Sequence, residues 1–139
     1  MTNPPTMIRS SNMSRWHSPM LVVDFKYNII RIHRSTLDAL GNPKYIEILV
    51  SPRQAKIGIR AQGKQTITSQ KVNLESLLRQ RSIQLYSTDL VRELLAINPN
   101  WEDEQIYRME GVLIDSEDMV MFDGLDSELI HNDEYATAQ

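Results

Sequence analysis

Residues 20–61 read MLVVDFKYNIIRIHRSTLDALGNPKYIEILVSPRQAKIGIRA and carry the clearest strand and turn signals of the chain. In IIRIHR, Ile30 and Ile32 fall on one side of an extended chain and Arg31 on the other, as in a half-buried β-strand. YIEILV and KIGIR alternate in the same way, and residues 51–55 between them predict a hairpin turn. MLVVDF is a fourth predicted strand, followed by a turn at residues 27–28.

A short helix is expected between the second and third of these strands. Ser35 or Thr36 can cap it by accepting a hydrogen bond from a free backbone N–H, and Leu37 follows on its apolar side. Gly41 offers the left-handed conformation that ends helices, so the helix is expected to stop there. Farther along, QTITSQKV is an edge strand or merely extended, and LESLLRQR predicts a short amphipathic helix.

The chain from residue 82 onward repeats this order. IQLYS alternates like a strand, and TDLVRELLAI predicts a helix capped by Ser87 or Thr88. QIYRMEGVLI and MVMFDG then predict two strands around an acidic turn. From Leu125 onward we expect either a short helix or an acidic tail.

Both halves therefore read strand, short helix, strand, turn, strand. Ile30-x-Ile32 aligns with Ile83-x-Leu85, which indicates internal duplication. The predicted fold class is α+β, with two βαββ-like halves forming one small mixed domain. The expected organisation is a flexible N-terminal arm at 1–18, a single α+β domain at 19–124 whose halves are 19–81 and 82–124, and an acidic C-terminal tail at 125–139.

Length and composition favour one globular domain. The chain has 139 residues, of which 41% are hydrophobic and 24% charged, values close to globular averages. There is no cysteine, which excludes a disulfide framework and thiolate metal sites. No apolar run approaches the roughly 20 residues of a membrane helix, and the N-terminus lacks a signal-peptide pattern. We therefore expect a cytoplasmic protein without membrane contact.

Charge is divided unequally along the chain. Residues 1–81 hold 13 Lys and Arg against 4 Asp and Glu, whereas residues 82–139 hold 2 against 14. Such asymmetry indicates a polyanion-binding face, an acidic partner-binding region, or attraction between the halves within the fold or between subunits. The sequence leaves these alternatives open.

The basic half supplies the candidate nucleic-acid contacts. Lysine and arginine that neutralise phosphates release counterions and give salt-dependent affinity. No array of aromatic residues accompanies them, which favours duplex DNA over a single strand. The candidates are Lys26, Arg31, Arg34, Arg53, Lys56, Arg60 and Lys64.

Two acidic sets in the other half are candidate contacts for a protein partner. Neither has the spacing or the glycine of an EF-hand, so we expect solvated loops and no metal site. The three histidines lie too far apart for a paired metal site, and catalytic motifs such as GxSxG and HExxH are absent. No catalytic residue, cofactor or enzymatic activity is therefore predicted. The acidic candidates are Glu102, Asp103, Glu104, Asp115, Glu117 and Asp118.

Residues 23–61 resemble the AbrB-like swapped-hairpin family of bacterial transcription regulators and antitoxins. The shared residues are Val23-Asp24, Ile30 and Ile32, Leu37-x-x-Leu40-Gly41, Ile46-Glu47-Ile48 and Ile57-x-Ile59. The family's Gly-Arg and Ile-Pro marks correspond here to Tyr27-Asn28 and Ile32-His33. The resemblance implies dimeric hairpins that grip DNA, with Lys26 and Arg34 nearest to the family's basic positions.

The function expected from these features is that of a small regulatory or accessory binding protein. Its basic half would bind DNA and its acidic half a partner protein or another copy of the chain. The alternative is a non-enzymatic structural or protein-interaction module, in which the charge split drives self-association alone. A head-to-tail contact of that kind builds rings or filaments.

Overall fold

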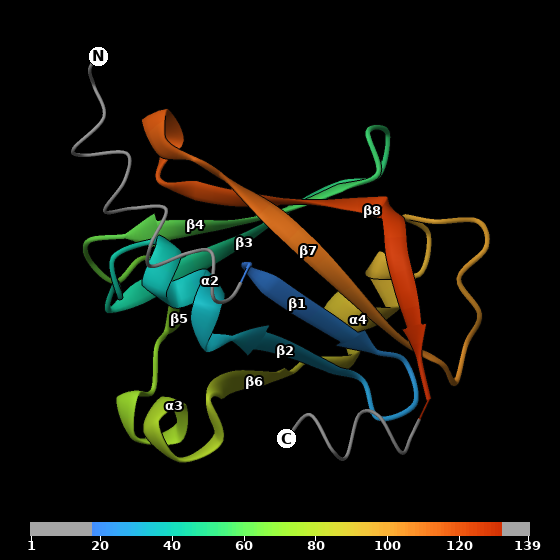
Figure 1. Ribbon diagram of the computed structural model, residues 1–139, viewed down its shortest axis with the longest axis horizontal. Helices are drawn as coiled ribbons and strands as arrows, with labels where there is room; N and C mark the ends of the chain where they lie inside the picture. Colours follow the sequence, from blue (N-terminus) through green and yellow to red (C-terminus); the bar gives the residue numbers. More distant parts are fainter. Residues whose placement is uncertain (1–17, 132–139) are drawn as a thin grey trace.

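The structure is a computed structural model and describes residues 18–131 (Figure 1). Over this range the chain forms one antiparallel sheet of eight strands and three short α-helices. The elements are, in chain order, β1 (Met20–Asp24), β2 (Ile29–His33), α2 (Arg34–Ala39), β3 (Tyr45–Ser51), β4 (Lys56–Gln62), β5 (Gln70–Lys71), α3 (Leu74–Gln80), β6 (Ser82–Tyr86), α4 (Thr88–Leu94), β7 (Ile106–Ile114), the 3-10 turn η1 (Asp115–Glu117) and β8 (Met119–Ile130).

The sheet curls into a half-barrel (Figure 1). Its strands lie in the order β5-β3-β4-β8-β7-β1-β2-β6, so the two edges are formed by β5 and β6. Helix α3 is the only element between these two strands in the sequence. The region where β5, α3 and β6 meet is called the seam below.

The apolar residues that alternate along the strands face the inside of the curl. Leu21 opposes Ile32 across β1 and β2, and Ile32 opposes Ile83 across β2 and β6. These three residues are buried and belong to one core cluster. The helices complete this core with Leu37 from α2, Leu77 from α3, and Val91 and Leu94 from α4.

Strand β8 bends midway along its length. Residues 119–122 pair with β4 on one side and with the end of β7 on the other, whereas residues 127–130 pair with the beginning of β7. The ladder between β7 and β8 shifts register after Met109, which leaves several residues of β8 unpaired at the bend. Gly124 lies in this bend, where its N–H donates to the carbonyl of Ala55 at 2.7 Å and its carbonyl accepts from the buried Asn98 side chain at 2.9 Å.

An aromatic cluster fills the space beneath the end of β8. Phe25, Trp101 and Tyr107 lie with ring centroids 5.3–6.0 Å apart, which is the usual range for interacting aromatic pairs. The Trp101 Nε1–H donates to Ser127 Oγ at 2.8 Å, and Tyr107 Oη accepts from the Glu102 N–H at 2.7 Å. The long loop between α4 and β7 is thereby attached to the sheet.

The predicted α+β class with two βαββ halves is wrong, because the chain forms mostly one curled antiparallel sheet. β1 pairs with β7, β2 with β6, and β4 with β8, so strands of the two halves are interleaved within this sheet. The segments that suggested duplication are neighbours in that sheet, because Ile30 opposes Leu85 and Ile32 opposes Ile83. Their similarity arises from a shared buried face. It does not arise from equivalent positions in two halves.

The predicted arm and tail lie largely outside the described residues. Within the described range, β8 continues to Ile130, where we expected a short helix or a tail to begin at Leu125. The reason is that Ile130 opposes Ile106 and is buried, a pairing that no local pattern specifies. Helix α2 also begins earlier than expected, because His33 Nδ1 caps it by accepting from the Ser35 N–H at 3.0 Å.

Gly124 has no room for a side chain. A Cβ at this position would collide with the Ile97 side chain, whereas a Cβ at Gly63 would meet nothing within 4 Å. We expect Gly124→Ala to lower the free energy of unfolding by about 1–3 kcal/mol because it overpacks the core. The matched substitution Gly63→Ala should change it by less than about 0.5 kcal/mol. Urea denaturation of both variants measures the difference, and equal stabilities would contradict the role assigned to the bend.

Candidate binding site

The structure does not bring the seven predicted DNA contacts onto one surface. Lys56 and Arg60 lie on β4, whereas Arg31 lies on β2 and Arg34 at the start of α2. Strands β8, β7 and β1 separate β4 from β2. At a spacing of about 4.8 Å per strand, the two groups are about 19 Å apart along a sheet that also curls.

Three of these seven cations are in ion pairs. Arg34 pairs with Asp38 at 3.7 Å, Lys56 with Asp123 at 3.4 Å, and Arg60 with Glu47 at 3.1 Å. Each pair neutralises part of the charge that a phosphate would meet. The others lie apart: Arg53 and Lys64 are exposed in a turn and a loop, Lys26 lies over the Tyr27 ring, and Arg31 is half-buried.

The opposite charges of the two halves hardly meet in the fold. Of the five ion pairs found within residues 18–131, only Lys56–Asp123 joins a cation from the basic half to an acid from the acidic half. The other four lie within one half. Within residues 18–131, ion pairs between the halves therefore account for one cation of the basic half.

The predicted acidic contacts form two separate groups. Glu102, Asp103 and Glu104 lie in the loop between α4 and β7, where Asp103 pairs with Arg92 at 2.9 Å. The hydrogen bond from Arg92 holds the pKa of Asp103 below its usual value. Asp115, Glu117 and Asp118 are exposed at the tip between β7 and β8. Within the described range, no three His, Asp or Glu side chains gather as a metal site does.

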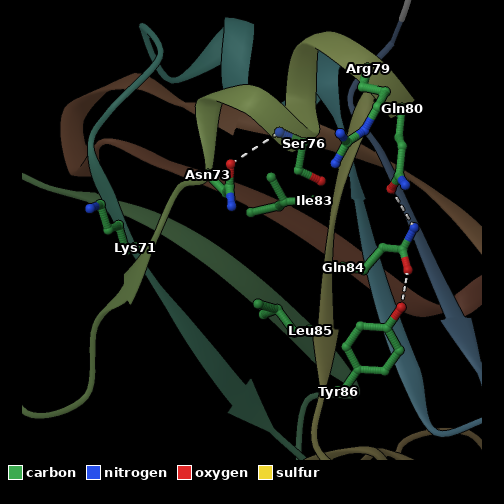
Figure 2. A pocket seen from close by; sticks show the side chains of 9 residues that line it. All are labelled: Lys71, Asn73, Ser76, Arg79, Gln80, Ile83, Gln84, Leu85 and Tyr86. Atoms are coloured by element: carbon green, nitrogen blue, oxygen red, sulfur yellow. Dashed lines mark hydrogen bonds between the residues drawn. The ribbon is translucent and has the colours of Figure 1, made fainter.

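A pocket of about 270 Å³ lies at the seam (Figure 2). Strand β6 forms one side of it, α3 one end, and the only lining residue from β5 is Lys71. Ile83 and Leu85 contribute apolar surface, because they belong to the inner face of the sheet at its edge. The lining residues are Lys71, Asn73, Ser76, Arg79, Gln80, Ile83, Gln84, Leu85 and Tyr86.

Hydrogen bonds hold the polar lining of the seam pocket in place. Asn73 Oδ1 accepts from the Ser76 N–H at 3.0 Å and so caps α3. Along β6, Tyr86 Oη donates to Gln84 Oε1 at 2.5 Å, and Gln84 Nε2 donates to Gln80 Oε1 at 2.7 Å (Figure 2). The pocket wall is therefore ordered without any ligand.

The seam pocket is positively charged. Its lining includes Lys71 and Arg79 and no Asp or Glu, and neither cation forms an ion pair with another described residue. Two further exposed cations, Lys44 and Arg81, lie just before β3 and just after α3. Residues 71–81 hold three Lys and Arg and one acid, Glu75, so positive charge is in excess here and attracts an anionic ligand.

None of the candidate residues expected from the sequence lines the seam pocket. The expected nucleic-acid contacts lie on or beside alternating strands, whereas Arg79 lies on a helix and Lys71 on a strand of two residues. A local signal was nevertheless present, because residues 76–88 contain two arginines and no Asp or Glu. The expected apolar face of this helix also differs from the observed one: Leu77 is buried, but Leu74 and Leu78 are 64% and 65% exposed.

Glu47 attaches the loop that leads to β5. Its Oε1 accepts from Arg60 Nη2 at 3.1 Å and from Gln62 Nε2 at 2.8 Å, and its Oε2 accepts from Thr68 Oγ1 at 2.8 Å. The hydrogen bond from Thr68, followed by that from Arg60, lowers the pKa of Glu47 below its ordinary value of 4.5. Ionised Glu47 therefore stabilises the folded chain and positions the segment that carries Lys71.

This lowered pKa predicts a loss of stability in acid. The contribution of Glu47 is fully present above its unfolded pKa and is lost as the pH falls through the lower folded pKa. We expect the melting temperature of Glu47→Gln to fall less between about pH 6 and about pH 3 than that of the unaltered chain. Glu110→Gln is the matched control, because Glu110 is exposed and has no described side-chain partner. If the melting temperatures of all three proteins fell equally over this pH range, the role of Glu47 would be ruled out.

Comparisons with known protein families, curated proteins and solved structures found no match to this chain. The resemblance of residues 23–61 to the swapped-hairpin family therefore stays a prediction. Within residues 18–131, no helix is both long enough and apolar enough to cross a membrane.

Proposed function

We propose that this chain is a non-enzymatic interaction module that binds an acidic segment of a partner protein at the seam pocket. The observation that supports this proposal most directly is the composition of the pocket. Lys71 and Arg79 belong to the lining of this pocket, and the lining contains no carboxylate. A site of this kind attracts an anion and repels cationic segments.

The remainder of the lining favours a peptide as the ligand. Leu85 provides half-buried apolar surface for side chains of a partner, and Tyr86 is 72% exposed beside it. Tyrosine and arginine are enriched where proteins bind one another, because each combines contact area with hydrogen bonding. Asn73 and Gln84 offer polar groups for the main chain or side chains of a peptide.

Binding of duplex DNA stays a prediction with less support. A duplex is held by several cations that reach successive phosphates on one face. Here three of the seven candidates are in ion pairs, and the cations of β4 and β2 lie on distant strands. The acidic candidates around Asp103 and Glu117 stay predicted contacts for a further partner.

The proposal is tested with a fluorescein-labelled peptide of alternating glutamate and valine residues. We expect it to bind the full chain, and to bind more weakly as salt rises from about 50 to about 200 mM. Lys71→Ala/Arg79→Ala should weaken this binding by about twofold to thirtyfold, because exposed ion pairs contribute about 0.2–1 kcal/mol each. Fluorescence anisotropy measures both effects, and a lysine–valine peptide of equal length is the ligand control.

Lys26→Ala/Arg53→Ala is the comparison variant. It removes the same charge from two turns that hold predicted DNA contacts, and neither residue lines the seam pocket. The proposal requires this variant to bind the acidic peptide like the unaltered chain. Equal weakening by both double variants, or tight binding of a DNA duplex that only Lys26→Ala/Arg53→Ala reduces, would contradict it.

A further inference from the structure

The free edge of β6 presents backbone groups to the seam. The Arg34 N–H donates to the Arg81 carbonyl at 2.9 Å, which identifies these two residues as a hydrogen-bonded pair that continues the ladder between β2 and β6. Opposite residues in an antiparallel ladder alternate between bonded and non-bonded pairs. Ile83 and Leu85 therefore direct their N–H and C=O groups toward β2, whereas those of Gln84 and Tyr86 point away from it.

No other described strand pairs with this outer edge of β6. Near its start, the Ser82 carbonyl accepts from Ser76 Oγ at 3.4 Å, so α3 covers that end. Beyond this point the edge groups of Gln84 and Tyr86 have no strand partner. A row of unpaired N–H and C=O groups is a template for another strand.

The seam pocket follows this edge. Four consecutive residues of β6, Ile83 to Tyr86, line it, although successive side chains of a strand point to opposite faces. A pocket that contacts both faces of one strand lies along the strand's edge. Its volume of about 270 Å³ is below the roughly 300–1,000 Å³ of sites that enclose small molecules. An extended peptide needs only such a shallow site.

We propose that the acidic partner segment binds as an added strand along the free edge of β6, with its backbone paired to Gln84 and Tyr86 and its acidic side chains near Lys71 and Arg79. This inference rests on the proposed function and specifies its binding mode. Main-chain hydrogen bonds supply affinity in this mode, and pockets for alternate side chains supply specificity.

Charge distinguishes this occupant from a second copy of the chain. Pairing two β6 edges would bring the Lys71 and Arg79 of one copy toward those of the other. Like charges placed opposite each other destabilise strand pairs. An acidic extended segment meets the same edge with complementary charge, and its alternating apolar side chains would reach the half-buried Leu85.

The decisive comparison is Gln84→Pro with Gln84→Ala. Both variants lose the side-chain hydrogen bonds to Gln80 and Tyr86, but only proline removes the outward N–H. An edge strand tolerates proline where its N–H faces outward. We expect Gln84→Ala to bind the glutamate–valine peptide within about threefold of the unaltered chain, and Gln84→Pro to bind at least about fivefold more weakly, as loss of one hydrogen bond implies. Circular dichroism verifies that both are folded.

Amide hydrogen exchange of the unaltered chain tests the same inference without a substitution. With saturating peptide, the Gln84 and Tyr86 amides should gain protection while those of Ile83 and Leu85, already paired with β2, change little. Unchanged exchange at Gln84 and Tyr86, or equal affinities of the two Gln84 variants, would overturn strand addition. The proposed function would still be supported in that case if peptide binding weakened with rising salt and with the loss of Lys71 and Arg79. Protection of Gln84 and Tyr86 that rises with protein concentration before peptide is added would also overturn the inference, because a second copy would then occupy the edge.

Discussion

The bend in β8 is the constraint on which the rest of the described structure depends. β8 is the strand that joins the β5-β3-β4 part of the sheet to the β7-β1-β2-β6 part. Residues 119–122 pair with both parts, and beyond them the chain bends at Gly124, where only a residue without a side chain fits against Ile97. The buried Asn98 side chain and the Ala55 carbonyl hold the backbone of Gly124 in this bend. Two hydrogen bonds and one missing side chain thus fix the bend of β8 within the curled sheet.

The position of the seam follows from this curl. The sheet turns its inner face around one core but does not close, so that β5 and β6 remain edges connected through α3. Natural proteins usually protect such edges with charges or covering elements. Here α3 covers one end of β6, and Lys71 and Arg79 supply positive charge beside the remainder. In the proposed binding mode, the same features disfavour the pairing of two copies at this edge and favour an acidic segment.

Local signals in the sequence predicted the secondary structure better than they predicted the fold. The β3–β4 hairpin, the turn before β2, the end of α2 near Gly41 and the Ser87 cap of α4 all depend on residues close together in the chain, and each prediction was confirmed. Strand partners depend on contacts between distant residues. Alternation alone therefore could not show that Ile32 lies opposite Ile83, or that β8 continues to Ile130. The site could not be predicted for the same reason. Residues of β5 and β6 line one pocket only because these strands are the two edges of the curled sheet.

Chemical-shift mapping by NMR tests most directly the central claim, that the open seam of the half-barrel is the binding site. The isotope-labelled chain is titrated with the glutamate–valine peptide, and shifts are followed for every assigned backbone amide. The account predicts that the largest shifts fall on Lys71, Arg79 and residues 83–86. Shifts centred on the outer face of β4, around Lys56 and Arg60, with the seam unchanged would contradict it.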